Sequence, residues 1–316
     1  MKKVLTFALV LLLSFAVFAG GSSEKKDDGK FVVGICQLVQ HPALDAATQG
    51  FKDALVAEFG DKVVIDEQNA SGEINNCSTI INGFVSKNVD LIMANATPAL
   101  TAAASATNTI PILGTSITHY GTALEIDNWT GVVGSNISGT SDLAPLDQQA
   151  AMILEWFPNV KSVGLVYCTA EPNSIFQIEE VEKTLAGLGV KTQRFSFTDS
   201  NDIAAVVQKA CDSSDVLYIP TDNTAASNAE LVTNITLAAK TPVFVGEIGN
   251  SAGIAALSIS YYDLGVTTGK MAVKVLKGEV DIKTLPVEYT TAEKKFNPDM
   301  CAALGITPLA GYTSSK

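Results

Sequence analysis

The sequence has 316 residues, of which 17% are charged and 7% aromatic, a composition typical of a folded chain with room for two domains of ordinary size. The 33 acidic residues outnumber the 21 basic ones, and the formal net charge of −12 excludes nucleic acid as an expected partner, because phosphates are bound by lysine and arginine. The same excess charge favours a soluble monomer, since copies of the chain repel one another.

The N-terminus has the pattern of a secretory signal peptide. Two lysines precede the apolar run 4–18, and Val17-Phe18-Ala19 fits a cleavage site. This run is shorter than the ~20 apolar residues that span a bilayer. We therefore expect residues 1–19 to be removed on export to the periplasm or the cell exterior, and residues 20–30 to form a flexible tether.

Beyond the tether, short β-branched runs alternate with segments whose apolar residues recur at helical spacing. In chain order, the expected elements are a strand at 31–35, a helix at 44–55, a strand at 63–65, a helix at 74–85, and strands at 89–93 and 110–113. Such alternation is typical of a parallel, doubly wound α/β sheet.

The pattern then repeats in the second half of the chain. Three pairs of matching positions, at offsets of 125 to 131 residues, carry the repeat: Gly34 with Gly164, Asp90 with Asp215, and Pro111 with Pro242. A strand at 255–260, a helix near Asp263 and a strand at 285–289 follow the second repeat, which indicates that the chain crosses back to the first half.

The expected fold is therefore α/β, with two doubly wound parallel-sheet lobes joined by a multi-segment hinge. We expect the N-terminal lobe to comprise residues 31–141 and 256–282, and the C-terminal lobe to comprise residues 142–255 and 283–316.

Ligands of open α/β sheets bind beyond the carboxyl ends of the strands, so the polar residues that follow each strand are the candidate contacts. These are Gln37, Thr97 and Ser116 in the first lobe, and Asn173, Ser174, Asp222, Asn223 and Glu247 in the second. The loops lead into helix N-termini, which favour an anionic group, whereas the chain has a single arginine, Arg194. We expect helix ends and hydroxyls to bind a ligand carboxylate and Asp222 to bind an ammonium, as in a zwitterionic amino acid.

Three of these candidates also have a purely structural interpretation. Ser174 and Gln177 match the S-x-x-Q capping box, Thr97 suits the N-cap position before Pro98, and Asp222 suits the start of a helix. The sequence leaves both interpretations open.

One motif resembles a catalytic site. Residues 249–253 match the G-x-S-x-G nucleophile elbow, with Ser251 as the nucleophile. An elbow needs a helix after the serine, but a strand-like run follows, and both histidines, His41 and His119, precede Ser251. We therefore expect no enzymatic activity, and a secreted hydrolase that uses Ser251 is the alternative from another class.

The sequence predicts neither a metal site nor a cofactor. It has two histidines, no CxxC pair, no Walker A motif and no G-x-G-x-x-G after the first strand. An exported chain can form disulfides, but the sequence does not say which of its five cysteines pair: Cys36, Cys77, Cys168, Cys211 and Cys301.

Seven short runs together resemble the ABC-transporter substrate-binding proteins of the tryptophan/tyrosine-binding type. The runs are Val33–Leu38, His41–Ala47, Gly50–Asp53, Ala96–Ala99, Glu171–Ser174, Pro220–Thr224 and Tyr261–Gly265, and the resemblance as a whole covers about residues 30–308. The resemblance implies a type I periplasmic-binding-protein fold, an aromatic amino acid as the ligand, and delivery of that ligand to a membrane permease with a cytoplasmic ATPase.

The same resemblance implies roles for individual residues. It assigns the ligand head group to Asn173, Ser174, Asp222 and Asn223, the first-lobe side of the site to Gln37, Thr97 and Ser116, and a cleft-facing position to Asp142. Many relatives are lipoproteins with a cysteine after the signal peptide, but this chain has Gly20-Gly21 there, so we expect no lipid anchor.

Two further alternatives stay open. The same fold could bind a sugar or nucleoside, for which stacking aromatic residues would be diagnostic, but the sequence does not place Tyr120, Phe176 or Tyr261 in the cleft. A sensor or repressor core is the other alternative, against which the signal peptide and the lack of an N-terminal helix-turn-helix both count.

Overall fold

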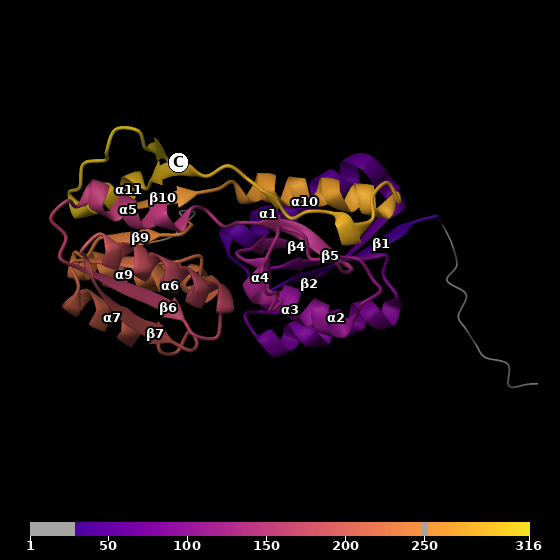
Figure 1. The fold of residues 1–316 in the computed structure, drawn as a ribbon, viewed down its shortest axis with the longest axis horizontal. Coiled ribbons are helices and arrows are strands. Elements are labelled where there is room, and N and C mark those ends of the chain that lie inside the picture. The colour runs from indigo at the N-terminus through magenta and orange to yellow at the C-terminus, as the bar shows by residue number, and fades with distance from the viewer. Residues whose placement is uncertain (1–28, 248–251) are drawn as a thin grey trace, which may run out of the picture. The chain divides into compact units, whose positions relative to one another are not determined.

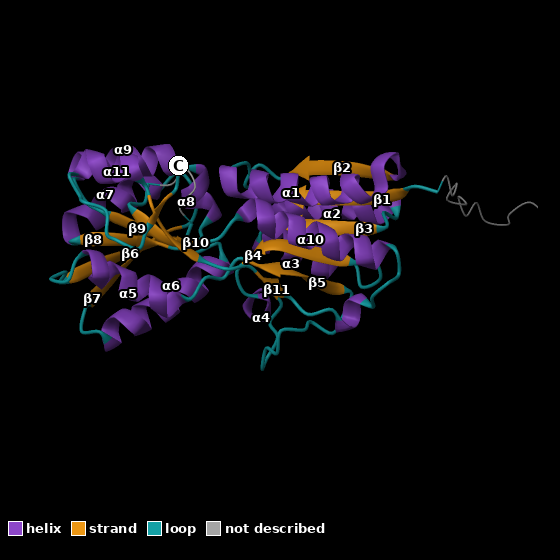
Figure 2. Ribbon diagram, turned by 90° about the horizontal axis from the view of Figure 1, so that it is seen from above, coloured by secondary structure: helices purple, strands orange, loops and turns teal. Residues whose placement is uncertain are grey.

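The computed structural model describes residues 29–247 and 252–316, so the expected signal peptide, most of the expected tether and Ser251 lie outside the described residues. Two sheets are present, and helices cover both faces of each (Figures 1 and 2). No helix within the described ranges combines the length and apolarity needed to cross a bilayer.

The first lobe is built on a six-stranded parallel sheet with the order β11-β5-β4-β3-β1-β2. Its elements are β1 (Phe31–Gln37), α1 (Pro42–Phe59), β2 (Val63–Asn69), α2 (Ile74–Lys87), β3 (Leu91–Asn95), α3 (Thr97–Ala106), β4 (Ile112–Ile117), α4 (Tyr120–Ala123), β5 (Ile137–Ser141), α10 (Tyr261–Leu276) and β11 (Glu288–Tyr289), with short 3₁₀ turns at Gly60–Lys62 and Ile282–Thr284.

The second lobe is built on a seven-stranded sheet with the order β13-β12-β10-β9-β8-β6-β7, in which only the β10–β12 pair is antiparallel. Its elements are α5 (Leu146–Trp156), β6 (Ser162–Cys168), α6 (Pro172–Gly187), β7 (Lys191–Phe197), α7 (Ile203–Ser213), β8 (Val216–Ile219), α8 (Asn223–Ser227), α9 (Ala229–Ala239), β9 (Val243–Val245), β10 (Ala255–Ser258), β12 (Glu293–Phe296), α11 (Pro298–Leu304) and β13 (Thr313–Ser314).

The repeat seen in the sequence corresponds to a repeat in topology. The order β2-β1-β3-β4-β5 in one sheet matches β7-β6-β8-β9-β10 in the other. The matching aspartates also make equivalent hydrogen bonds. Asp90 accepts a hydrogen bond from the backbone N–H of Val32, and Asp215 accepts hydrogen bonds from the backbone N–H groups of Lys161 and Ser162. Each carboxylate thus secures the start of the central strand of its lobe, which confirms two similar doubly wound lobes.

Three segments connect the lobes: residues 142–145, 259–260 and 290–292. The second and third crossings between the lobes lie at other residues than expected. Residues 256–258 belong to the second sheet, because β10 pairs with β9 and β12, and β11 belongs to the first sheet, because it pairs with β5. Strand pairing depends on backbone neighbours that lie far away in the sequence, which local pattern does not reveal.

All five cysteines are buried and free in the described structure. The thiols of Cys36 on β1 and Cys77 on α2 lie within hydrogen-bonding distance of each other in the core of the first lobe. They pack there as small apolar groups.

Helices α1 and α10 lie side by side on one face of the first sheet and approach closely at glycines. A Cβ atom at Gly265 would overlap the backbone carbonyl of Ala47, whereas a Cβ atom at Gly83 in α2 would meet nothing within 4 Å. Gly265 therefore permits the helix contact, and Gly83 has no such role.

We expect Gly265→Ala to lower the free energy of unfolding by about 2 kcal/mol, since a backbone atom has to move, and Gly83→Ala to raise it by about 0.5–1 kcal/mol. Urea denaturation followed by circular dichroism measures both. A Gly265→Ala variant as stable as Gly83→Ala would contradict the close packing of α1 on α10.

Candidate functional site

A polar cavity lies between the lobes at the carboxyl ends of the strands. Its walls come from both lobes: His41, Leu44, Ser116, Thr118, Asp142 and Tyr261 from the first lobe and the connecting segments, and Asn173, Thr221, Asp222, Asn223, Ala226 and Glu247 from the second. Most of these residues lie within about five positions of the carboxyl end of a strand, which is where a doubly wound sheet binds its ligand.

Among the residues that line this cavity, four buried polar atoms lack a hydrogen-bond partner within the described structure. They are His41 Nδ1, Ser116 Oγ, Asp142 Oδ1 and Asn173 Oδ1. Buried polar groups in proteins are nearly always hydrogen-bonded. A group of such atoms around one cavity therefore indicates a site for a polar ligand.

Asp142 is the charged member of this group. The residue is 6% exposed, its Oδ2 accepts a hydrogen bond of 2.8 Å from the Tyr261 hydroxyl, and its Oδ1 has no partner. Burial raises the pKa of Asp142, although the hydrogen bond from Tyr261 opposes this shift. No lysine or arginine is among the described residues that line the cavity. A ligand cation would therefore compensate the buried carboxylate.

The His41 ring presents an acceptor to the cavity. The Asn223 amide donates through Nδ2 to Glu171, so its Oδ1 is an acceptor, and His41 Nε2 lies 3.3 Å from that oxygen. The Nε2 atom therefore carries the proton and Nδ1 does not. Burial lowers the pKa of His41, which keeps the ring neutral. With Asp142 Oδ1 and Asn173 Oδ1, the cavity offers three unpartnered acceptors.

Ser116 lies in a strained part of β4. Its φ of 55° is in the left-handed region, and the register between β4 and β5 shifts between Gly114 and Ile117. A non-glycine residue at positive φ costs free energy that the surrounding structure must supply, and such residues cluster at binding sites. This irregularity in β4 accompanies the placement of the buried Ser116 residue at the cavity wall.

The carboxylate of Glu171 binds the N-terminus of α8. It accepts hydrogen bonds from the backbone N–H groups of Asn223 (3.0 Å) and Thr224 (2.9 Å), and from both of their side chains. The N–H groups at this helix end are thus bound within the lobe, so they are not available to a ligand carboxylate as the sequence interpretation expected.

Asp222 is also bound within its own lobe. Its Oδ1 accepts from the backbone N–H of Ala225, and its Oδ2 accepts from the N–H of Cys168 (2.7 Å) and the hydroxyl of Ser174 (2.8 Å). Burial and then the nearby Glu171 charge raise the pKa of Asp222 to about 7. The carboxylate therefore caps α8 and ties it to β6 and α6.

The lobes also touch each other directly, both beside the cavity and at its wall. The rings of His119 and Phe176 stack with centroids 4.4 Å apart and planes 1° from parallel, and Thr118 Oγ1 lies 3.4 Å from Thr221 Oγ1. Burial lowers the pKa of His119, and the neutral ring accepts at Nδ1 from the backbone N–H of Thr122.

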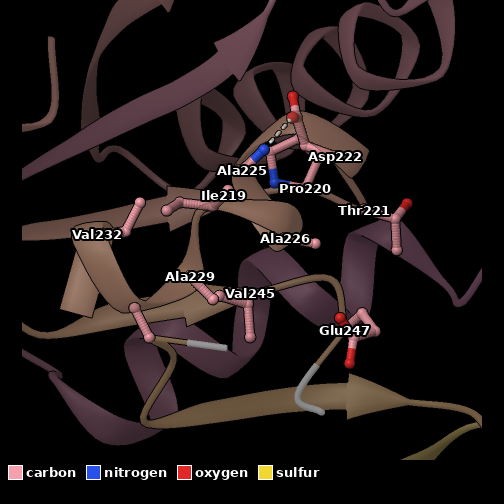
Figure 3. Close-up of a pocket in the computed structure, with 11 residues that line it drawn as sticks. Ile219, Pro220, Thr221, Asp222, Ala225, Ala226, Ala229, Val232, Val245 and Glu247 are labelled. Atoms are coloured by element: carbon pink, nitrogen blue, oxygen red, sulfur yellow. Dashed lines mark hydrogen bonds between the residues drawn. The ribbon is translucent and has the colours of Figure 1, made fainter. Parts of the chain in front are cut away.

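A second, small cavity, which we call the side chamber, adjoins the polar cavity in the second lobe (Figure 3). Its mouth consists of Thr221, Asp222, Ala226 and Glu247, which the two cavities share. The other walls are apolar: Ile219, Pro220, Ala225, Ala229, Val232, Val245 and Ala252.

The model of one protein family, described as ABC transporter substrate binding protein, matches residues 32–308. The chain belongs to this family. A curated relative, the "Tyrosine-binding protein" of Clostridioides difficile (strain R20291), is 31% identical over 331 residues, which cover 98% of this chain and 94% of the relative. This substrate-binding protein thus belongs to a group of binding proteins rather than enzymes.

Two solved structures are also similar to this substrate-binding protein. One is an ABC domain from Streptococcus pneumonia in complex with L-Trp, which is 32% identical and has a TM-score of 0.84 over 90% of this chain and 99% of that chain. The other is the ligand-free, open structure of a substrate-binding protein with adhesive properties from Clostridium difficile, which is 34% identical over the same shares and has a TM-score of 0.68. The described backbone is therefore closer to that of the L-Trp complex.

Six of the nine candidate contacts of this substrate-binding protein line the polar cavity: Ser116, Asp142, Asn173, Asp222, Asn223 and Glu247. The other three are buried but are not among its lining residues. Gln37 bonds to Thr48 and Asp45, Thr97 opens α3, and Ser174 donates to Asp222.

The capping interpretations had mixed outcomes. Asp222 is the N-cap of α8, as expected, and His41 is the N-cap of α1 with Pro42 after it. The N-cap of α3 is Ala96 at a φ of 87° rather than Thr97. Ser174 lies inside α6, whose N-cap is Glu171, so the expected capping box does not form.

Four further lining residues are not among the nine candidate contacts: His41, Thr118, Thr221 and Tyr261. His41 and Thr221 each follow a strand in a run that carried the family resemblance, which was a usable signal. Of the three aromatic residues that the sequence did not place, Tyr261 lines the cavity and Phe176 lies at the lobe contact. Tyr120 is in the core of the first lobe.

Within the described ranges, no group of three or more His, Cys, Asp or Glu residues could hold a metal ion. Ser251 and most of its motif lie outside those ranges, so the structure does not test the expected absence of an elbow.

Proposed function

We propose that this protein captures a zwitterionic amino acid with an aromatic side chain in the polar cavity between its lobes and delivers it to a membrane permease with a cytoplasmic ATPase. The observation that carries the proposal is the group of four unpartnered polar atoms around one cavity. The relatives support the ligand class, since one is named for tyrosine and another was solved with L-Trp.

The ligand's ammonium group is assigned to the three unpartnered acceptors. An ammonium has three N–H donors and a full positive charge, and the acceptors are Asp142 Oδ1, Asn173 Oδ1 and His41 Nδ1. Charge-assisted hydrogen bonds to the buried Asp142 carboxylate supply most of the attraction. Glu247 adds a second negative charge at the same cavity.

The ligand's carboxylate is assigned to hydroxyl donors of the first lobe. Ser116 Oγ is buried and unpartnered, and Thr118 lies two residues further along the chain on the same cavity wall. This assignment replaces the helix N-terminus expected from sequence, because Glu171 already binds the N–H groups of α8.

We also propose that the protein works outside the cytoplasm as a monomer after removal of residues 1–19. The basic and apolar pattern at the N-terminus supports export, and the net charge of −12 supports the monomer.

Isothermal titration calorimetry tests the ligand class. We expect L-Phe, L-Tyr or L-Trp to bind with a Kd well below ~1 mM, which corresponds to about −4 kcal/mol. N-acetyl-L-phenylalanine, which lacks the ammonium, is the matched control and is expected not to bind. If none of the three amino acids binds, or if a hexose or nucleoside binds instead, the proposed function is wrong.

A further inference from the structure

His41 stands at the N-cap of α1 without capping that helix. Its backbone is extended, as is usual for an N-cap, but its side chain makes no hydrogen bond to the first turn of the described helix. The residues that favour this position are serine, threonine, aspartate and asparagine, whose side chains bind the free N–H groups. A histidine can do the same, since His119 accepts at Nδ1 from the backbone N–H of Thr122 at the start of α4. The ring of His41 is therefore available to groups outside its own helix.

One nitrogen of the His41 ring bonds to the second lobe. Its Nε2 atom lies 3.3 Å from Oδ1 of Asn223, which is the first residue of α8. The Asn223 amide is held in one orientation, because its Nδ2 atom donates to the Glu171 carboxylate at 2.6 Å. The Asn223 oxygen is thus fixed as an acceptor, and the second lobe accepts a proton donor from the first lobe at this point.

The other nitrogen of the His41 ring is left for the ligand. His41 lines the polar cavity, and its Nδ1 atom is buried without a hydrogen-bond partner among the described residues. Because Nε2 carries the proton that points at Asn223, Nδ1 is a lone-pair acceptor. A ligand N–H that donates to Nδ1 holds this tautomer and makes Nε2–H a stronger donor to Asn223, since hydrogen bonds in a chain polarise one another.

We infer that His41 links capture of the ligand to contact between the lobes, and that it does so only as a neutral ring: Nδ1 accepts from the ligand ammonium while Nε2–H donates to Asn223. This inference rests on the proposed function and adds to it a condition on the protonation of one residue. A protonated ring carries an N–H on both nitrogens, so it would direct a donor and a positive charge at the ammonium. Binding of an amino acid should therefore weaken as the pH falls.

The charged groups that act on His41 are acidic and come from both lobes. Burial lowers the pKa of His41 below its ordinary value of 6.5, whereas the hydrogen bond to Asn223 and the charges of Glu171 and Asp45 oppose this shift. The other titratable residues that line the cavity are Asp142, Asp222, Glu247 and Tyr261. The ring is therefore neutral at pH 7.5, and at acid pH a proton competes with the ligand ammonium for Nδ1.

Calorimetric titration of the full protein with L-Phe at pH 7.5 and pH 4.5 tests the inference. Protonation of the cavity carboxylates also weakens binding at low pH, so the readout compares the Kd ratio between the two pH values in the wild type and in His41→Gln, whose amide does not titrate. We expect this ratio to be at least fivefold larger in the wild type, because each pH unit below the pKa of the ligand-free ring costs about tenfold in affinity. The chain has one other histidine, and His119→Gln is the matched control, which should keep the wild-type ratio.

Equal ratios in the wild type and His41→Gln would overturn the inference while the proposed function stands. If the wild type binds no aromatic amino acid at pH 7.5, both fail. A measurement on the wild type alone covers the case in which His41→Gln does not bind. In ¹⁵N-histidine spectra, saturating L-Phe should lower the pH at which His41 gains its proton by about one pH unit or more, and an unchanged midpoint contradicts the inference.

A double-mutant cycle tests the link to the second lobe. His41→Asn keeps an acceptor near the position of Nδ1 and is a favourable N-cap, but its side chain is too short to reach Asn223. We expect it to weaken L-Phe binding at pH 7.5 about tenfold or more, because the buried Asn223 oxygen loses its donor. Asn223→Ala removes the same hydrogen bond, so the double variant should bind within about threefold of the weaker single variant. Losses that multiply, or a His41→Asn variant that binds as the wild type does, would show that His41 does not link the ligand to the second lobe.

Discussion

Replacing Asp142 with asparagine is expected to weaken amino-acid binding about 100-fold. The substitution keeps the size of the side chain but removes the buried negative charge that the ligand ammonium compensates, and truncating one partner of such a pair typically costs about 2–5 kcal/mol. Calorimetry with L-Phe measures the loss. Asp147→Asn, which makes the same change at an exposed position in the first turn of α5, is the control and should bind as the wild type does.

The ligand-free Asp142→Asn variant should melt at the same temperature as the wild type or above it. Burial raises the pKa of Asp142, which means that its charge is a cost to the ligand-free fold. The increase in melting temperature on adding L-Phe should be lost, since that increase depends on affinity. A variant that still binds L-Phe within threefold of the wild type would show that the ammonium binds elsewhere, for example at Glu247.

The second large effect concerns stability. Asp222→Ala should lower the free energy of unfolding by about 3 kcal/mol, because it leaves the N–H groups of Ala225 and Cys168 and the hydroxyl of Ser174 without their acceptor. Urea denaturation at pH 8 measures the loss, and Asp212→Ala, an exposed change on α7, should stay within about 0.5 kcal/mol of the wild type. If the Asp222→Ala variant is as stable as the wild type and loses only ligand binding, Asp222 binds the ligand, as the sequence predicted, rather than stabilising the fold.

The loss of unfolding free energy caused by Asp222→Ala should be larger at pH 5 than at pH 8. In the folded protein the pKa of Asp222 is about 7, above its ordinary value of 3.8, so the folded state holds the proton more tightly than the unfolded chain does. The stabilisation linked to that proton is fully present below the unfolded pKa and is lost as the pH rises through 7. A penalty that does not change with pH would contradict the raised pKa.

Local pattern was enough to predict the elements that hold the site. The alternation of strands and helices follows from residues near one another in the sequence, and the repeat that pairs Asp90 with Asp215 follows from comparing the two halves of the chain. The location of the cavity at strand ends followed from topology alone. These features depend on periodicity and on backbone geometry, which a single sequence displays.

Which polar residues bond to one another within the fold, and which keep an unpartnered atom for a ligand, could not be predicted in the same way. Ser174 and Asp222 are 48 positions apart and bond to each other, whereas Asp142 keeps an unpartnered oxygen. Glu171 was not a candidate, yet it occupies the helix end that the ligand carboxylate was expected to use. Which carboxylate finds a partner within the fold depends on how distant elements pack, and composition does not contain that information.

The hydrogen bond between Asp142 and Tyr261 joins the first connecting segment to the residue that follows the second. The proposed ammonium site therefore lies where the first two connecting segments are joined, and a ligand bound there contacts the same carboxylate that links them.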